Sequence, residues 1–164
     1  MVRRARTGDV PGIRRLVDLY TKDGRLLSKP TVALYEDVPE FFVAVTEGGG
    51  EVVGCGALHV LWEDLAEIRT LAVDPASQGQ GIGHRIVTEL LAQARELGVQ
   101  RVFVLTFERE FFAKHGFVEI DGAPVPPAVY EQLLKSYDEG VAEFLGLDRV
   151  KPNILGNTRM LLHL

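Results

Sequence analysis

The glycines within residues 71–87, LAVDPASQGQGIGHRIV, are spaced in a way that suits phosphate binding. Gly79, Gly81 and Gly83 follow an apolar run and stand directly before a helical pattern. Glycines let the backbone approach a ligand closely, and successive N–H groups in such a turn can form an anion-binding nest. The helix expected to begin near Gly83 would add the positive end of its dipole. The loop therefore predicts a site for a phosphate or a pyrophosphate.

The spacing excludes two common phosphate-binding motifs. A dinucleotide fingerprint, G-x-G-x-x-G, would need a third glycine at His84 if it began at Gly79, or at Ile86 if it began at Gly81. A P-loop, G-x-x-x-x-G-K-[ST], beginning at Gly79 would also need a glycine at His84, followed by a Lys-Ser/Thr pair that the sequence does not have.

The segments before the loop follow mainly strand-like patterns. We expect a strand over residues 2–6, then a helix to about Tyr20 with Thr7 as N-cap and Asp9 in its first turn. A short helix is predicted over residues 31–38. The runs FFVAVTE and EVVGCGALHVL read as strands joined by a turn of three glycines, and EIRTLAV reads as a strand that begins at Glu67.

The segments after the loop alternate between helix and strand. Apolar spacing predicts a helix over residues 82–97 that ends at Gly98. A strand (RVFVLTF), a short helix ending at Gly116 and a strand beginning FVEI follow; residues 127–145 predict two helices, and TRMLLHL predicts a last strand. The whole order indicates an α/β protein of the α+β type, with a hairpin-rich first half and one βαβ crossover.

Composition limits the classes of function. The chain has 164 residues and a formal net charge of −5, which fits one domain over residues 1–164 and argues against nucleic-acid binding. There is no apolar run of about 18 residues and no secretory signal, so we expect no membrane span and a cytoplasmic location. The single cysteine, Cys55, lies in an apolar strand and is expected in the core, and the four histidines lack metal-ligand spacing, so no metal is expected.

The pattern Gln78-x-x-Gly81-x-Gly83 after the strand TLAVDP resembles the acyl-CoA loop of the GNAT superfamily of N-acetyltransferases. The stretch FFAKHGF, residues 111–117, resembles the helix-to-strand signature of the same superfamily. The stretches EIRTLAVDP, RVFVLTFEREFFAKHGF and KPNILGNTRMLLHL are similar to the short, stand-alone N-acetylglutamate synthases of actinobacterial type. The resemblance implies a mixed, mostly antiparallel sheet flanked by helices, with a splayed central strand pair.

The resemblance also implies acetyl-CoA as co-substrate. The strand before the loop would carry pantetheine, and a backbone N–H near Ala72 or Val73 would stabilise the oxyanion. The residues expected to bind the cofactor are Leu71, Ala72, Val73, Gln78, Gly79, Gln80, Gly81, Ile82, Gly83, His84 and Phe112.

Two residues are predicted to take part in the acetyl transfer. An α-ammonium has a pKa near 8, so a modest base is enough, and Glu67 is the candidate, acting through a water. The alternative for Glu67 is an ion pair with Arg69, which lies on the same side of a strand. Thr106 would orient a water. Phe112 stands where many superfamily members have a tyrosine acid, so the CoA thiolate would take its proton from the substrate ammonium or from water.

The acceptor implied by the resemblance is the α-amine of L-glutamate. A dicarboxylate needs cationic and polar partners, and the candidates are Lys29, Arg69, Asn157, Thr158 and Arg159, together with Lys151. The alternative for any one cation is a solvated surface charge. Glutamine, another amine or a peptide remains possible as acceptor, as does a non-catalytic acyl-CoA-binding regulator. Residues 121–148 would form a lid over the acceptor or a homodimer contact.

Overall fold

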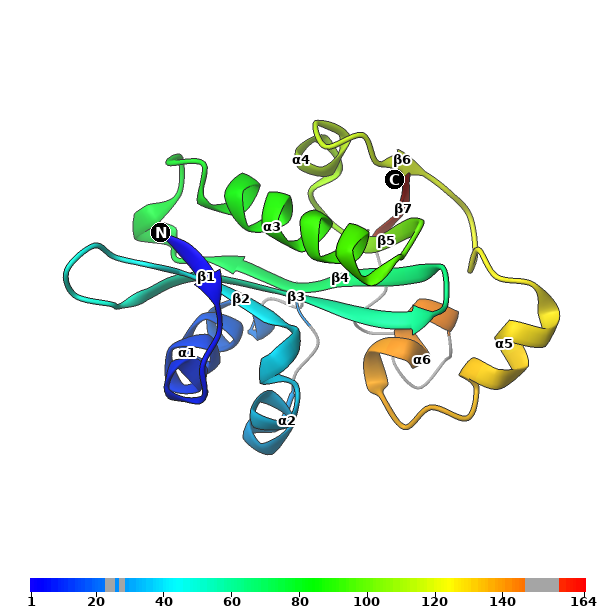
Figure 1. The fold of residues 1–164 in the computed structure, drawn as a ribbon, viewed down its shortest axis with the longest axis horizontal. Helices are drawn as coiled ribbons and strands as arrows, with labels where there is room; N and C mark the ends of the chain where they lie inside the picture. Colours follow the sequence, from blue (N-terminus) through cyan, green and yellow to red (C-terminus); the bar gives the residue numbers. More distant parts are fainter. Residues whose placement is uncertain (23–25, 27–28, 147–156) are drawn as a thin grey trace.

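The computed structural model describes residues 1–22, 26, 29–146 and 157–164 (Figure 1). Within these residues, seven strands form one sheet in the order β1-β2-β3-β4-β5-β7-β6. The strands are β1 (Val2–Arg4), β2 (Phe41–Val45), β3 (Val52–Trp62), β4 (Leu65–Val73), β5 (Arg101–Thr106), β6 (Val118–Glu119) and β7 (Thr158–His163). Every neighbouring pair is antiparallel except β4 and β5, which are parallel. The predicted mixed, mostly antiparallel sheet is confirmed.

Helices cover both faces of this sheet. They are α1 (Val10–Thr21), α2 (Thr31–Glu36), α3 (Ile82–Leu97), α4 (Arg109–Ala113), α5 (Pro127–Leu133) and α6 (Glu139–Leu145). In Figure 1, α3 lies on one face, and α1, α2 and α6 lie on the other. The apolar residues of α3 at helical spacing, such as Ile86, Leu90 and Ala94, are fully buried against the sheet. Gly98, with a φ of 87°, ends this helix as predicted.

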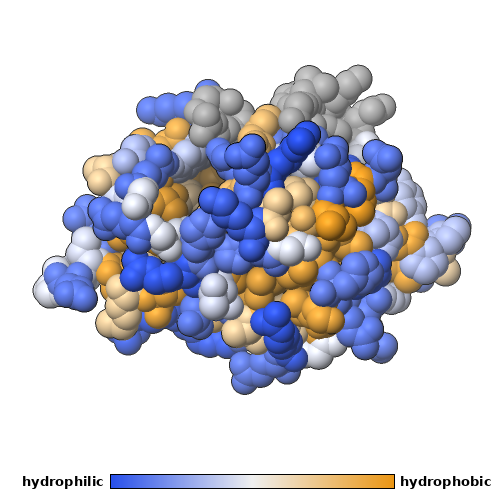
Figure 2. Space-filling view, turned by 90° about the horizontal axis from the view of Figure 1, so that it is seen from above, coloured by the Kyte–Doolittle hydropathy of each residue, from blue (hydrophilic) through white to orange (hydrophobic). Residues whose placement is uncertain are grey.

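The distribution of hydrophilic and hydrophobic side chains on the surface is that expected of amphipathic helices packed on a sheet. Figure 2 shows that hydrophilic side chains cover much of the face seen from above, with hydrophobic side chains between them. None of the helices described here has the length and apolar character needed to cross a membrane. Cys55 is fully buried, as expected for a core residue.

The chain before α1 differs from the prediction. Strand β1 ends at Arg4, and residues Thr7–Asp9 form a 3-10 turn, so Thr7 is not the N-cap of α1. The physical reason is the carboxylate of Asp9, which accepts the N–H of Arg6 at 2.7 Å and pairs with the Arg3 guanidinium at 2.7 Å. These contacts hold the turn and delay the start of the helix.

The second helix is also shorter than predicted. It ends at Glu36, and Val38–Glu40 forms a separate 3-10 turn. Pro39 fits the break, since a proline has no backbone N–H to continue the helical hydrogen bonds and its ring clashes with the carbonyl four residues before it. The turn leads directly into β2.

The central strands β4 and β5 separate along their length. Their parallel pairing runs from Leu65↔Arg101 to Ile68↔Val104 and stops there, while β4 continues to Val73. Strand β5 continues against β7 as far as Thr106↔Thr158. The predicted splayed strand pair is therefore confirmed, and the last residues of β4 have an edge without a partner strand on the β5 side.

A bulge in β4 begins where the two strands part. On β3, Cys55 pairs with Ala72 and Ala57 pairs with Arg69, so two residues of β4 oppose one residue of β3. Thr70, inside the bulge, has a φ of 55°, a left-handed conformation that is uncommon for a β-branched residue. Such strain is kept only where the surrounding structure imposes it. The bulge changes the direction of β4 directly after Arg69.

Candidate active site

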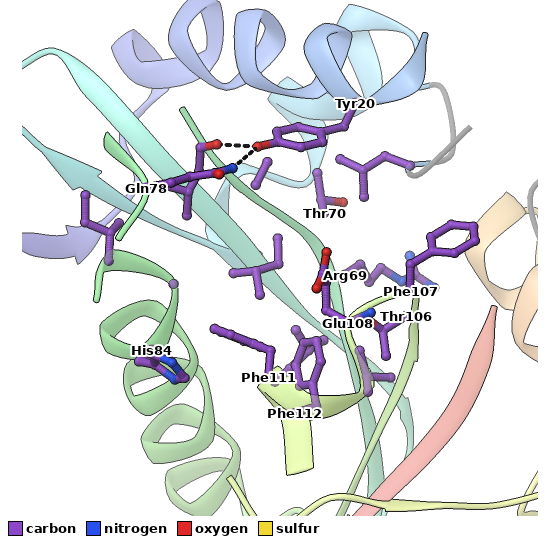
Figure 3. Close-up of a pocket in the computed structure, with 18 of the residues that line it drawn as sticks. Tyr20, Arg69, Thr70, Gln78, His84, Thr106, Phe107, Glu108, Phe111 and Phe112 are labelled. Carbon is purple, nitrogen blue, oxygen red and sulfur yellow. Dashed lines mark hydrogen bonds between the residues drawn. The ribbon is translucent and has the colours of Figure 1, made fainter. Parts of the chain in front are cut away.

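A cavity of about 530 Å³ lies where β4 and β5 part (Figure 3). Its walls come from the last half of β4, the glycine loop, the first turn of α3, the end of β5 and helix α4. Tyr20 of α1 and Arg69 close it on the opposite side of the sheet. The cavity therefore connects the glycine loop, on one face of the sheet, with the buried side chain of Arg69 on the other face.

The glycine loop has the backbone conformation that its sequence predicts. Gly79 and Gly81 have φ values of 82° and 76°, and Gly81 is the N-cap of α3. An alanine at either position would be strained, because side chains other than glycine rarely adopt this region. Helix α3 has 16 residues, so its dipole adds positive potential at the loop. A pyrophosphate fits this arrangement of N–H groups and dipole.

Tyr20 links helix α1 to the loop. Its hydroxyl donates to the carbonyl oxygen of Val73 and accepts a hydrogen bond from Gln78 Nε2 at 3.0 Å (Figure 3). The base of the loop is also tied to α1, since the Arg15 guanidinium pairs with Asp74 at 2.8 Å. Two side chains of α1 thus fix the position of the loop relative to the sheet.

Aromatic side chains form the wall opposite the loop. The ring of Phe111 stacks on His84 with 4.4 Å between centroids, and a Cβ added to Gly83 would lie 3.2 Å from that ring. Phe112 is 3% exposed and packs edge-on against Phe117. His84 Nδ1 lies 2.8 Å from His115 Nε2. The Phe111 ring thus packs closely over Gly83, where a larger residue would not fit without a shift.

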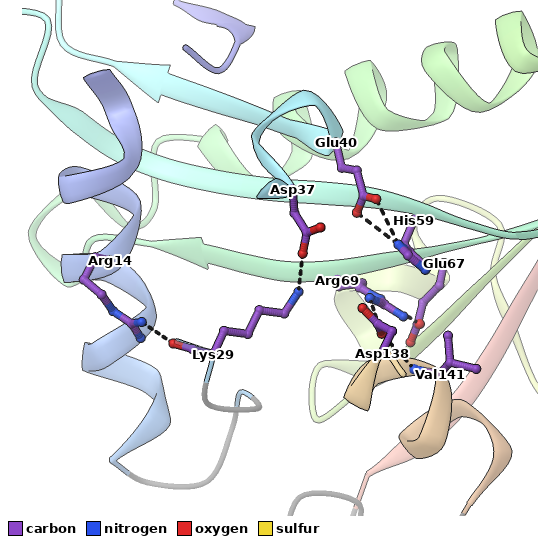
Figure 4. Close-up of polar contacts among 9 residues, drawn as sticks. All are labelled: Arg14, Lys29, Asp37, Glu40, His59, Glu67, Arg69, Asp138 and Val141. Carbon is purple, nitrogen blue, oxygen red and sulfur yellow. Dashed lines mark hydrogen bonds and ion pairs between the residues drawn. The ribbon is translucent and has the colours of Figure 1, made fainter. Parts of the chain in front are cut away.

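Arg69 and Glu67 form a buried ion pair at the other end of the cavity (Figure 4). Arg69 Nε donates to Glu67 Oε1 at 3.0 Å, and Arg69 Nη1 lies 2.8 Å from Asp138 Oδ1 at the start of α6. The same Asp138 oxygen accepts the N–H of Val141 and so caps α6. Nη2 of Arg69 is buried and has no hydrogen-bond partner among the described residues. A buried donor without a partner is unusual in proteins and marks a place where a ligand can bind.

The charges of this cluster shift one another's pKa values. Burial raises the pKa of the Glu67 carboxyl, although Arg69 and His59 act in the opposite direction. Burial disfavours the charge on Arg69, but Glu67 and Asp138 outweigh it and raise the pKa of the guanidinium. Burial raises the pKa of Glu143, on α6, to about 8, and the charge of Glu67 adds to this effect. A carboxylate with a raised pKa beside a cavity is a candidate base.

Comparison with known proteins places the chain in a family. Residues 13–117 match the model of the acetyltransferase (GNAT) family. The chain belongs to the GNAT family of acetyltransferases. An amino-acid acetyltransferase of Mycobacterium tuberculosis is 65% identical over 164 residues, covering 99% of this chain and 93% of that protein.

Solved structures of GNAT proteins agree with this assignment. The crystal structure of Rv2747 from Mycobacterium tuberculosis in complex with CoA and a second ligand, NLQ, has a TM-score of 0.97 and 64% identity, and covers 100% of this chain and 99% of that chain. The N-acetylglutamate synthase of Neisseria gonorrhoeae in complex with coenzyme A and N-acetyl-glutamate has a TM-score of 0.78 and 25% identity. It covers 100% of this chain and 35% of that chain.

In this GNAT chain, the residues predicted to bind the cofactor gather around the cavity, except Gln80. Thr106 lines it too, with its hydroxyl accepting the N–H of Glu108 at 2.8 Å. Glu67 does not line the cavity, and β4 begins two residues before it, at Leu65, so Glu67 is inside the strand rather than at its start. The predicted residues that line the cavity are Leu71, Ala72, Val73, Gln78, Gly79, Gly81, Ile82, Gly83, His84, Thr106 and Phe112.

The residues predicted to bind the acceptor do not all lie at the cavity. Arg69 lines the cavity, whereas Lys29 pairs with Asp37 at 3.6 Å. Arg159 donates to backbone carbonyls of Gly122, Glu143 and Phe144. These bonds use both Nη atoms of Arg159 to tie β7 to α6.

Two other predicted acceptor residues lie at the start of the last strand. Asn157 precedes β7, and Thr158 begins this strand opposite Thr106. Lys151 lies outside the described residues.

The sequence analysis missed several residues of the site, including four with titratable side chains. Tyr20 and Glu108 line the cavity, and Asp138 contacts Arg69. His59 stands opposite Glu67 on the neighbouring strand. Of these, only Glu108 could have been found from the local sequence, because it closely follows Thr106 at the end of β5. Tyr20, His59 and Asp138 come from segments distant in the sequence.

Replacing Gly140 with alanine is expected to destabilise the protein. A Cβ at Gly140 would lie 2.5 Å from Arg69 Cζ, so either the buried guanidinium, with its ion pairs, or α6 must shift. We expect the free energy of unfolding to fall by about 1–3 kcal/mol, although glycine to alanine usually stabilises a helix. Urea unfolding measures this change. Gly8→Ala is the control, because a Cβ there meets nothing within 4 Å; equal stability of the two variants would contradict the close packing.

Proposed function

We propose that this protein transfers the acetyl group of acetyl-CoA to the α-amine of an amino acid, with L-glutamate as acceptor. The observation that carries the proposal is the cavity that runs from the glycine loop to Arg69, the buried ion-pair partner of Glu67. The likeness to an amino-acid acetyltransferase along nearly the whole chain supports it. L-Glutamine is the second candidate acceptor, because only the side-chain terminus differs.

The loop and β4 would hold the co-substrate. When bound, acetyl-CoA supplies the acetyl thioester that the amine attacks. The N–H groups of Gly79, Gly81 and Gly83 suit its pyrophosphate, and the free edge of β4 beyond Ile68 offers main-chain groups to pantetheine. A backbone N–H near Ala72 or Val73 would stabilise the oxyanion.

Glu67 would accept the proton of the acceptor ammonium through a water. Its raised pKa brings it closer to that of an amine, which favours proton transfer near neutral pH. Phe112 has no proton to donate, so we propose that the thiolate takes a proton from the attacking amine, with Thr106 orienting a water. Arg69 Nη2 would bind a carboxylate of the acceptor.

A thiol-release assay with each of the twenty amino acids tests this proposal. We expect release of CoA with glutamate or glutamine and little with alanine or lysine. Activity confined to peptides, polyamines or aminoglycosides would contradict the proposed acceptor class. Tight CoA binding without turnover on any acceptor would indicate a non-catalytic regulator instead.

Three further predictions from the sequence stay proposals. We propose that residues 1–164 act as one domain, that the protein works in the cytoplasm, and that it forms a homodimer. Analytical ultracentrifugation measures the oligomeric state, and a monomer at micromolar concentration would contradict the last of these.

A further inference from the structure

Glu40, His59 and Glu67 form a row of titratable side chains that leads from the interior toward solvent (Figure 4). Glu67 lies on β4, His59 on β3 and Glu40 in the 3-10 turn before β2. The side chain of Glu67 is 4% exposed, that of His59 is 19% exposed and that of Glu40 is 27% exposed. The exposure therefore rises step by step from the proposed base to the surface.

Strand register places His59 directly opposite Glu67. The two residues are Cα partners in the antiparallel ladder of β3 and β4. Side chains of opposed residues stand on the same face of a sheet, with Cβ atoms about 4.5–5.5 Å apart. Figure 4 shows the His59 ring between the carboxylates of Glu40 and Glu67.

Glu40 fixes the orientation of the imidazole. His59 Nδ1 lies 3.0 and 3.1 Å from the two oxygens of the Glu40 carboxylate. A carboxylate can only accept, so Nδ1 carries the hydrogen and Nε2 keeps its lone pair. Arg69 occupies Oε1 of Glu67, which leaves proton transfer to Oε2.

We propose that His59 is a positioning residue that relays the proton taken up by Glu67 to solvent. This inference rests on the proposed function, because Glu67 must first act as the base. One proton of the acceptor ammonium passes to Glu67 through water, and then through a second water to His59 Nε2, while His59 Nδ1–H stays bonded to Glu40. The imidazolium then loses a proton to water. As the amide C–N bond forms and the C–S bond breaks, a second N–H proton goes to the thiolate. The products are the N-acetyl amino acid, CoA thiol and one released proton.

Other charged groups face the two members of this relay. Glu67 is also influenced by Arg69 on β4, by Asp138 and Glu143 on α6, and by Arg159 on β7. His59 is also close enough to Asp138 to lower the pKa of that carboxyl.

A purely structural role of the His59–Glu40 pair is the alternative to the relay, with the pair only tying the turn before β2 to β3. His59→Gln separates the two roles, because the glutamine amide can still donate to Glu40 but cannot take up a proton. We expect kcat to fall about tenfold with the Kd for CoA unchanged, and added imidazole to restore part of the rate. The acidic limb of the kcat pH profile is expected to change shape. His163→Gln, at an exposed position, is the matched control.

The same variant in a Glu67→Gln background completes the test. A relay acts through Glu67, so His59→Gln should cost nothing further there. A kcat equal to that of the wild type, or a loss that persists unchanged in the Glu67→Gln background, overturns the relay. A fully active Glu67→Gln variant overturns the role of Glu67 as base and with it the relay, whereas a wild type without turnover overturns the proposed function.

Discussion

The Glu67→Gln variant is expected to turn over about 100-fold more slowly than the wild type, with the Kd for CoA unchanged. Glutamine has nearly the same shape and can still accept from Arg69 Nε, but it cannot accept a proton at neutral pH. The loop that suits CoA is formed by other residues, on the far side of the cavity. Steady-state thiol release measures the first quantity, and isothermal titration calorimetry measures the second.

The pH dependence of the wild type belongs to the same prediction. A base works only when it is deprotonated, so activity should fall as pH drops through the pKa of Glu67. Because burial raises this pKa, the acidic limb should lie above the ordinary carboxylate range. Glu119→Gln, at an exposed position, is the control and should keep the wild-type profile. A Glu67→Gln variant that keeps most of the turnover would disprove the role of Glu67 as base.

The Arg69→Met variant is expected to lose both stability and affinity for the acceptor. Methionine fills a similar volume, but it leaves the buried Glu67 carboxylate without its ion-pair partner. Breaking one side of a buried pair costs roughly 3–5 kcal/mol in free energy of unfolding. Loss of the donor Nη2 should raise the KM for the amino acid about 30-fold, since removing one partner of a buried charge contact costs about 2 kcal/mol or more.

A double variant separates the two effects. In Glu67→Gln/Arg69→Met the unpaired carboxylate is gone, so part of the lost stability should return, while the high KM should remain. Urea unfolding and acceptor titrations measure these quantities. If Arg69→Met alone kept the wild-type KM for the amino acid, Arg69 would not bind the acceptor, and its role would be to hold Glu67 and α6 together.

Helix α6 emerges as part of the site, although it lies outside the residues that match the family model. Asp138 caps this helix and contacts Arg69, and Gly140 lets the guanidinium pack against the helix backbone. Residues 121–148 were predicted to form a lid or a dimer contact. The structure shows that the first turn of α6 covers the buried ion pair, and both alternatives stay predictions.

The sequence by itself determined the features that depend on local backbone chemistry. Positive φ values need glycine, so Gly79, Gly81 and Gly98 could be assigned to a loop and a helix end. Helical periodicity placed α3, and strand-like runs placed β3, β4 and β5. The same residues carried the family resemblance, because a pyrophosphate loop is built from one short segment.

Only the tertiary structure decided which side chains meet at the acceptor end. Arg69 meets Asp138 and Glu67 meets His59 because α6 docks on the sheet and β3 pairs with β4 in one register. No local pattern encodes such contacts, and the charges of Arg159 and Lys29 looked equally suitable in the sequence. Folding directed Arg159 to backbone carbonyls and Lys29 to Asp37, and left Arg69 as the Lys or Arg side chain that lines the cavity within the described part of the chain. The energy of a buried charge depends on all its neighbours at once, and those neighbours are set by packing between segments far apart in the chain.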